Sequence, residues 1–209
     1  MIDAERVTNP ASGAAKARER PILFSSEMVK AILDGRKSMT RRVVKPQPDA
    51  VAAFQDGQPT EAYYGGWPKG GYAKKLTCPF GQPGDQLWVR ETHFRFIEIS
   101  AKGGSKKALY RADHPEWFCK WRPSIHMPRW ASRLTLEITA VRVERVQDIS
   151  ADDAEAEGFS FIHAPEGTPS GRYQHEEKFA RYWDSLNAKR GYGWDANPWV
   201  FVISFRRLP

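Results

Sequence analysis

The chain of 209 residues lacks most of the features that mark secreted, membrane-bound or metal-binding proteins. It has two cysteines, Cys78 and Cys119, which form neither a C-x-x-C pair nor a repeated spacing, and this argues against a zinc ribbon or a disulfide scaffold. It has no apolar run long enough to span a membrane, and its first twenty residues lack the apolar segment of a secretory signal. We therefore expect a soluble, cytoplasmic protein that contacts no membrane.

Metal-ligand patterns are equally scarce. The spacings of His114, Cys119 and His126, with Cys78, fit no common zinc template. Acidic residues at 152–157 could bind a cation for nuclease chemistry, but carboxylates near a helix start are favoured by the helix dipole in any case. We predict no metal ion and no cofactor.

The charge balance is more informative. Thirty-two Lys and Arg against twenty-five Asp and Glu give a formal net charge of +7, which is typical of proteins that meet a polyanion. Eight tryptophans, some of them among Gly, Pro and charged residues, could supply rings on which bases stack. Many basic proteins bind no polyanion, so composition alone leaves the partner open. We expect RNA or a nucleoside or nucleotide ligand.

Local patterns divide the chain into strands with a few helices between them. Residues 1–20 have no apolar periodicity and are expected to form a flexible N-terminal arm. Apolar and polar residues alternate at 133–146, and this pattern shifts by one residue at Val141, which predicts a bulge that bends a long strand. The run at 199–203 is apolar on both faces, which is typical of a central, doubly buried strand. Further elements are expected as strands at 21–24 and 86–91 and as helices at 26–33, 150–158 and 176–190.

The densest cluster of cations lies in residues 35–42. Lys37 and Thr40 are three residues apart, so their side chains would meet on one helical or 3₁₀ turn. Neighbouring positive charges, and burial in addition, would lower the pKa of Lys37 towards the value that a general base needs. Arginines stay protonated, but their guanidinium groups can bind a phosphate. The arginines of this turn are Arg36, Arg41 and Arg42.

These residues carry a resemblance to a known family. Residues 35–42 resemble the G-x-K-x-x-T-x-R signature of the ASCH domain, a PUA-like β-barrel superfamily, and residues 84–89 match its G-D-x-L-x-V strand. The strand and acidic helix at 133–158 and the last strand look like the following parts of that fold. Residues 122–133 are similar to the larger phage and prophage members.

The resemblance implies an α+β fold, a PUA-like mixed β-barrel with peripheral helices and loop insertions. The single domain would span 21–209. The insertions would lie near 46–82, 94–130 and 159–173, and the Gly- and Pro-rich part of the first is expected to be a long loop.

The resemblance also implies an activity. Small relatives include amidohydrolases that remove the acetyl group from N4-acetylcytidine with a Lys, a Thr and a Glu, which correspond to Lys37, Thr40 and Glu157 in this chain. In this interpretation Lys37 takes the hydroxyl proton of Thr40, which attacks the acyl carbon, while Glu157 positions the lysine or serves the leaving amine. Arg42 or a backbone N–H would stabilise the oxyanion.

Two other functions remain open for the same basic cleft: an RNA-binding module without catalysis, and a ribonuclease. An RNA- or nucleoside-directed hydrolase is the leading hypothesis, and the oligomeric state stays undetermined. The residues expected to contact the nucleic acid or nucleoside are Arg36, Arg41, Arg42, Trp88, Arg129 and Trp130.

Overall fold

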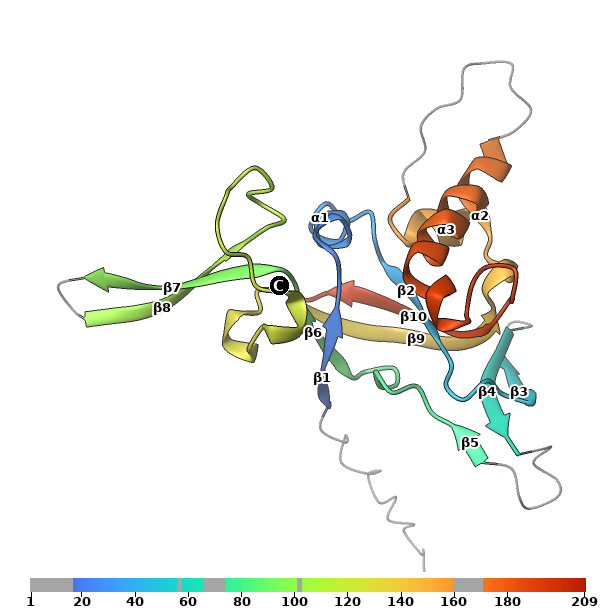
Figure 1. Ribbon diagram of the computed structural model, residues 1–209. Helices are drawn as coiled ribbons and strands as arrows, with labels where there is room; N and C mark the ends of the chain where they lie inside the picture. Colours follow the sequence, from blue (N-terminus) through green and yellow to red (C-terminus); the bar gives the residue numbers. More distant parts are fainter. Residues whose placement is uncertain (1–16, 56–57, 66–73, 101–102, 160–170) are drawn as a thin grey trace, which may run out of the picture.

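Figure 1 shows the computed structural model, which describes residues 17–55, 58–65, 74–100, 103–159 and 171–209. In chain order the elements are β1 (Glu19–Leu23), α1 (Ser26–Leu33), β2 (Met39–Val43), β3 (Ala50–Gln55), β4 (Gln58–Tyr64), β5 (Lys74–Leu76), β6 (Gln86–Arg90), β7 (His93–Ser100), β8 (Gly103–Tyr110), η2 (Ser124–His126), η3 (Arg129–Ala131), β9 (Thr135–Arg145), η4 (Val146–Asp148), α2 (Ala151–Ala156), α3 (Gly171–Asn187), η5 (Ala188–Arg190) and β10 (Trp199–Arg207). Within these ranges no helix has both the length and the apolar character needed to cross a membrane.

The centre of the molecule is a mixed five-stranded sheet in the order β1-β6-β9-β10-β2. β1 pairs with β6 in parallel, and the other neighbours are antiparallel. The predicted α+β class is therefore confirmed. Among the described strands no ladder joins the two edges, β1 and β2. A side chain links them instead, because Arg42 Nη2 on β2 donates to the carbonyl oxygen of Leu23 on β1 at 3.0 Å.

The longest strand, β9, carries the bulge that the sequence predicts. Ser204 on β10 faces Ala140, but the next residue, Phe205, faces Ile138, so Thr139 has no partner in the register. An extra residue in one strand bends that strand and increases its twist. The bulge lies two residues before the predicted slip at Val141.

β10 is buried on both faces, as its sequence predicts. Phe201, Ile203 and Phe205 pack into the main core, which also contains residues of α1 and the inner faces of β6 and β9. Val200 and Val202 point the other way, into a second core under α2 and α3. This strand therefore holds the two layers of the molecule together.

The predicted helices are present, with shifted ends. Ser25 caps α1 by accepting from the backbone N–H of Met28 at 3.4 Å, and Gly35 follows the helix with φ of +75°, a conformation that glycine adopts without a Cβ clash. α3 begins at Gly171, earlier than expected, and ends in a 3₁₀ turn before Gly191.

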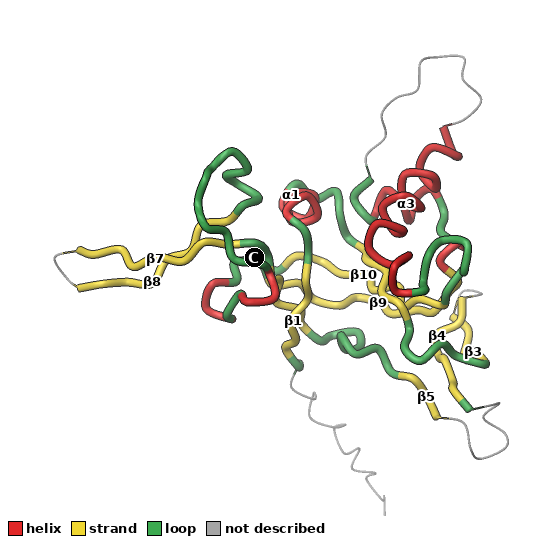
Figure 2. The backbone as a smooth tube through the Cα atoms, viewed as in Figure 1, coloured by secondary structure: helices red, strands yellow, loops and turns green. Residues whose placement is uncertain are grey.

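The described parts of residues 46–75 contain strands where a long loop was predicted, while residues 56–57 and 66–73 of that prediction lie outside the described residues. The expected long loop contains β3, β4 and β5, which form a separate antiparallel sheet. Proline, glycine and alanine obscure the apolar alternation there, although Ala62 and Leu76 are buried and join the main core. The segment near 94–130 contains the antiparallel hairpin β7–β8, which extends away from the central sheet at the end opposite β3–β5 (Figure 2).

Two other expectations fall largely outside the described residues. Most of the expected N-terminal arm, residues 1–16, lies there, while Glu19 and Arg20 belong to β1. Most of the expected insertion at 159–173 lies there too, because residues 160–170 are not described.

Candidate functional site

A pocket of about 420 Å³ opens between α1, β2 and α3. Its polar lining comes from the cation-rich residues 37–42 and from the end of α2. Aromatic side chains of the loop before α1 and of α3 line the rest. The lining residues used below are Phe24, Lys37, Thr40, Arg41, Arg42, Thr92, Ser124, Glu157, Phe179 and Tyr182. The structure therefore brings the three predicted catalytic residues to one cavity.

The chain reaches this pocket in an extended conformation. The backbone N–H of Lys37 donates to the carbonyl oxygen of Ala31 at 3.0 Å, and Lys37 then forms an isolated β-bridge with Glu157. Thr40 lies within β2 and is buried. The prediction that Lys37 and Thr40 share a helical or 3₁₀ turn is wrong, because β10 pairs with residues 39–43 and draws them into the sheet.

The Lys37 amine is held by three acceptors. Its Nζ donates to the carbonyl oxygens of Met39 and Glu157 at 2.7 and 2.8 Å, and to Glu157 Oε2 at 2.6 Å. The Lys37 and Glu157 side chains are 1% and 5% exposed, so this ion pair is almost completely shielded from water. Glu157 is thus a buried carboxylate at the end of α2, whereas Glu155 on the same helix is exposed.

Burial lowers the pKa of Lys37 below its usual value, since a charged amine is costly in a dry environment. The Glu157 carboxylate opposes this effect, and the charges of Arg42 and Arg41 lower the pKa further by smaller amounts. The predicted direction is confirmed. The main cause is desolvation rather than the neighbouring guanidinium groups.

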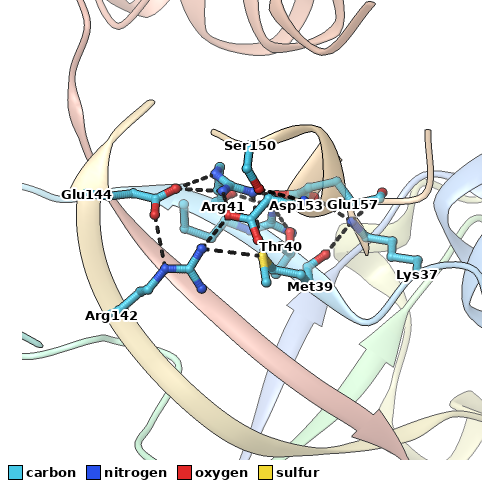
Figure 3. A network of polar contacts seen from close by, with 10 residues as sticks. Lys37, Met39, Thr40, Arg41, Arg142, Glu144, Ser150, Asp153 and Glu157 are labelled. Atoms are coloured by element: carbon cyan, nitrogen blue, oxygen red, sulfur yellow. Dashed lines mark hydrogen bonds and ion pairs between the residues drawn. The ribbon is translucent and has the colours of Figure 1, made fainter. Parts of the chain in front are cut away.

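Arg41 lines the pocket but is buried, and its guanidinium belongs to a network of ion pairs (Figure 3). Its side chain is 0% exposed and lies 2.6 Å from Glu144, 2.5 Å from Asp153 and 3.4 Å from Glu157. Arg142 completes the network by pairing with Glu144 and Asp153. Since three carboxylates occupy its guanidinium, we assign Arg41 to holding the site together and not to contacting a nucleic acid.

Arg42 also lines the pocket and, unlike Arg41, is partly exposed. Its Nη1 donates to Thr40 Oγ1 at 2.8 Å and to the Arg41 carbonyl oxygen at 3.0 Å. Its guanidinium lies 5.3 Å from the centre of the Phe24 ring, and no carboxylate of the described chain forms an ion pair with it. In the described structure Lys37 Nζ donates to Met39 and Glu157, while the Thr40 hydroxyl accepts from Arg42, so the predicted contact between Lys37 and Thr40 is not formed.

Four other predicted binding residues lie elsewhere. Arg36 is half-exposed beside Asp34, and Trp88 lies on β6 with the Arg129 guanidinium 5.8 Å from its ring centre. Arg129 is paired with Glu19, and Trp130 is 46% exposed. None of the four lines the pocket, so their role as nucleic-acid contacts stays a prediction.

Sequence reasoning missed several residues that build the site. Phe179 and Tyr182 lie in the helix predicted at 176–190, but they were not predicted as site residues, although both line the pocket. Glu144 and Asp153 were not expected to be partners of Arg41. Glu144 alternates with valines along β9, and no local signal distinguishes such a buried carboxylate from one that faces water.

Across the described ranges, no group of three or more His, Cys, Asp or Glu residues is arranged to hold a metal ion. Cys78 and Cys119 are free thiols. The polar and titratable lining residues that the following argument uses are Lys37, Thr40, Arg42 and Glu157.

Comparison with known proteins gives structural likenesses only. No protein-family model matches the chain, and no curated protein matches it. One similar solved structure is a protein of Enterococcus faecalis V583 from family DUF984, with a TM-score of 0.44 and 11% identity over 94% of this chain and 78% of that one. Another is an ASCH domain from Lactobacillus crispatus JV V101, with a TM-score of 0.39 and 13% identity over 91% of this chain and 79% of that one. At TM-scores this low neither likeness carries an argument, so the function must be argued from the pocket.

Proposed function

We propose that the protein is a nucleoside-directed amide hydrolase of the ASCH superfamily, acting on N4-acylated, most concretely N4-acetylated, cytidine. The observation that carries this proposal is the buried Lys37–Glu157 pair in the same pocket as a threonine whose hydroxyl contacts a guanidinium. A pair of titratable groups so deeply buried is costly for folding, and such groups concentrate at functional sites.

The size and lining of the pocket favour a nucleoside. Its volume of about 420 Å³ falls in the range of small-ligand sites, which is roughly 300–1,000 Å³. Tyr182, which is partly exposed, offers an aromatic face on which a pyrimidine could stack, while the buried Phe24 and Phe179 make the adjoining wall apolar. Ser124 and Thr92 add hydroxyl groups that could bind polar atoms of the ligand.

The proposed reaction begins with Lys37 in its neutral form, which burial favours. Glu157 Oε2 holds this amine at 2.6 Å, and the lone pair of the amine can act as a base. Lys37 then takes the hydroxyl proton while Thr40 Oγ1 bonds to the acyl carbon. The carbon–nitrogen bond breaks, and the 4-amino group of cytidine leaves with the proton from Lys37. Water then hydrolyses the acyl-threonine, which restores the threonine hydroxyl and releases acetate and a proton to solvent.

These reaction steps require the Lys37 amine and the Thr40 hydroxyl to approach each other once the ligand binds. Catalytic hydrogen bonds are often long in the free enzyme and shorten in the substrate complex. Arg42, which already contacts Thr40 Oγ1, is placed to stabilise both the alkoxide and the negative charge that develops on the acyl oxygen.

The test is acetate release from N4-acetylcytidine by the purified protein. Thr40→Val removes the hydroxyl at nearly constant volume, and Lys37→Met with Glu157→Gln removes the whole buried pair, so that no unpaired charge remains inside. Both variants should stay folded and lose about 10²–10⁴-fold in kcat/KM. Lys30→Met, which changes an exposed lysine of α1, is the control and should keep full activity. Normal turnover by either site variant would refute the proposal.

A second candidate is a non-catalytic RNA-binding module, favoured by the exposed side chains of residues 117–130. Trp117 and Trp130 are 47% and 46% exposed, and Arg129 lies in the same segment. Such a module would bind RNA with an affinity that falls steeply with salt and would release no acetate. Incubation with labelled RNA in the same assays tests the ribonuclease hypothesis, which predicts shortened strands.

A further inference from the structure

A second pocket, of about 360 Å³, lies beside the first and has a different character. It is formed where the start of β7 meets the segment that leads into η2. Its lining combines aromatic rings with cations and contains no carboxylate. The residues are Phe94, Arg95, Lys120, Trp121, Arg122, Pro123 and His126.

The cations of this second pocket are available to a ligand. None of Arg95, Lys120 and Arg122 forms an ion pair with a carboxylate of the described chain, whereas Arg133 nearby is paired with both Glu91 and Asp113. Lys120 and Arg122 are exposed, so their side chains can turn toward a bound anion. Three unpaired cations around one cavity are a favourable environment for phosphate.

His93 lies next to the residues that line this pocket in sequence. It is fully buried, and its Nε2 has no hydrogen-bond partner among the described residues. Burial is the main cause that lowers the pKa of His93; a hydrogen bond with the Glu91 carbonyl oxygen opposes it, and the charges of Arg95, Arg122 and Arg90 lower the pKa further by smaller amounts.

Trp121 supplies a ring beside these cations. Its indole N–H donates to the carbonyl oxygen of Trp117 at 3.1 Å, which fixes the orientation of the half-buried ring. An oriented tryptophan ring next to arginines is the combination with which proteins hold single-stranded nucleic acids. The ring stacks on a base while the arginines contact the backbone.

The same two segments contribute to the linings of both pockets. Thr92 and Ser124 line the first pocket, while Phe94 and Pro123 line the second. Two backbone hydrogen bonds between His93 and Arg122, of 3.1 and 2.8 Å, join these segments. A ligand in the first pocket would therefore contact segments whose next residues line the second pocket.

We propose that the second pocket binds the nucleotide adjacent to the one held in the first pocket. Its base would stack on Trp121, and its phosphate would be bound by Arg95 and Arg122. The substrate would then be a single-stranded nucleic acid that contains the acylated cytidine, and not a free nucleoside. The assignment of a neighbouring nucleotide rests on the function proposed for the first pocket.

The experiment compares ligands of increasing length. N4-acetylcytidine and oligonucleotides of two, three and five residues, each with one N4-acetylcytidine, are titrated against the full chain, in ribose and deoxyribose forms. Binding is followed by tryptophan fluorescence, and hydrolysis by acetate release. One stacked base and its phosphate should tighten binding about 10- to 100-fold over the nucleoside. Tighter binding of the ribose series would identify RNA as the source of this ligand.

Two variants test the assigned residues. Most of the increase in affinity with oligonucleotide length should be lost in the double variant Arg95→Ala/Arg122→Ala. It should also be lost in the single variant Trp121→Leu. The arginine variant should also lower the salt slope by about 0.7 for each lost phosphate contact. Lys74→Ala, which removes an exposed cation on β5 in the separate sheet, should keep the whole gain.

The outcomes separate this proposal from the function that it extends. A gain from chain length that the variants abolish supports the second pocket even if no acetate is released, and in that case the hydrolase is refuted instead. Acetate release with equal affinity for nucleoside and oligonucleotide would overturn the second pocket and leave the hydrolase standing. A gain that survives in both variants would also overturn it.

Discussion

Replacing Arg41 with methionine should destabilise the protein strongly, because Arg41 balances a buried set of charges. The set contains three cations and three carboxylates: Lys37, Arg41, Arg142, Glu144, Asp153 and Glu157. Arg41→Met leaves one negative charge in excess. That charge falls mainly on Glu144, whose side chain is 3% exposed.

The size of the effect follows from this geometry. Removing one partner of a buried ion pair costs about 3–5 kcal/mol, since the remaining charge stays desolvated. With a urea m-value of about 2–3 kcal/mol/M for a chain of this size, the unfolding midpoint should fall by about 1–2.5 M. Equilibrium unfolding followed by tryptophan fluorescence measures this shift.

A double-mutant cycle identifies the cause. Glu144→Gln in the Arg41→Met background restores neutrality and should recover at least about 1.5 kcal/mol relative to the sum of the single changes. Arg206→Met with Glu137→Gln is the matched surface control. Arg206 is 67% exposed, so its loss should cost less than about 1 kcal/mol. An Arg41→Met variant as stable as this control would refute the account of the network.

Three further predictions concern the pocket and its surroundings. The kcat/KM for acyl cleavage should rise with pH and level off above the lowered pKa of Lys37. In Glu157→Gln the rise should move to lower pH, because the Glu157 carboxylate raises the pKa of Lys37. A pH–rate profile without this rise would contradict the role of Lys37 as the base. The unfolding free energy should fall as pH drops below about 6.5, because His93 takes up a proton in the unfolded chain more readily than in the folded protein. Urea titrations at several pH values should show that the unfolding free energy of His93→Leu depends less on pH. Gly158→Ala should destabilise the protein more than Gly35→Ala. Both glycines have positive φ, but only at position 158 would the new Cβ lie 3.0 Å from the Cβ of Ala31. Equal midpoints of thermal unfolding in the two variants would contradict this packing.

The parts of the fold that could be predicted depend on neighbours in sequence. The apolar residues on both faces of 199–203 predict the central position of β10, and the phase slip near Val141 predicts the bulge. Ser25 and Gly35 mark the ends of α1 because capping and positive φ are decided by single residues.

The parts that could not be predicted depend on partners far along the chain. The extended path from Lys37 to Thr40 is set by pairing with β10, more than 150 residues later, and a local pattern cannot reveal it. Arg41 resembles a phosphate-binding residue in sequence, yet Glu144 and Asp153, 103 and 112 positions away, enclose it. Only the assembled fold distinguishes an arginine that binds carboxylates from one that is open to a ligand.

The most direct test of the central claim is a crystal structure with N4-acetylcytidine bound, obtained with the slow Thr40→Val variant so that the ligand stays intact. The pocket between α1, β2 and α3 should then hold the pyrimidine, with the acyl oxygen within hydrogen-bond reach of the Arg42 guanidinium and the Lys37 amine near the acyl group. A ligand bound away from Lys37, with this cavity empty, would contradict the assignment of the site.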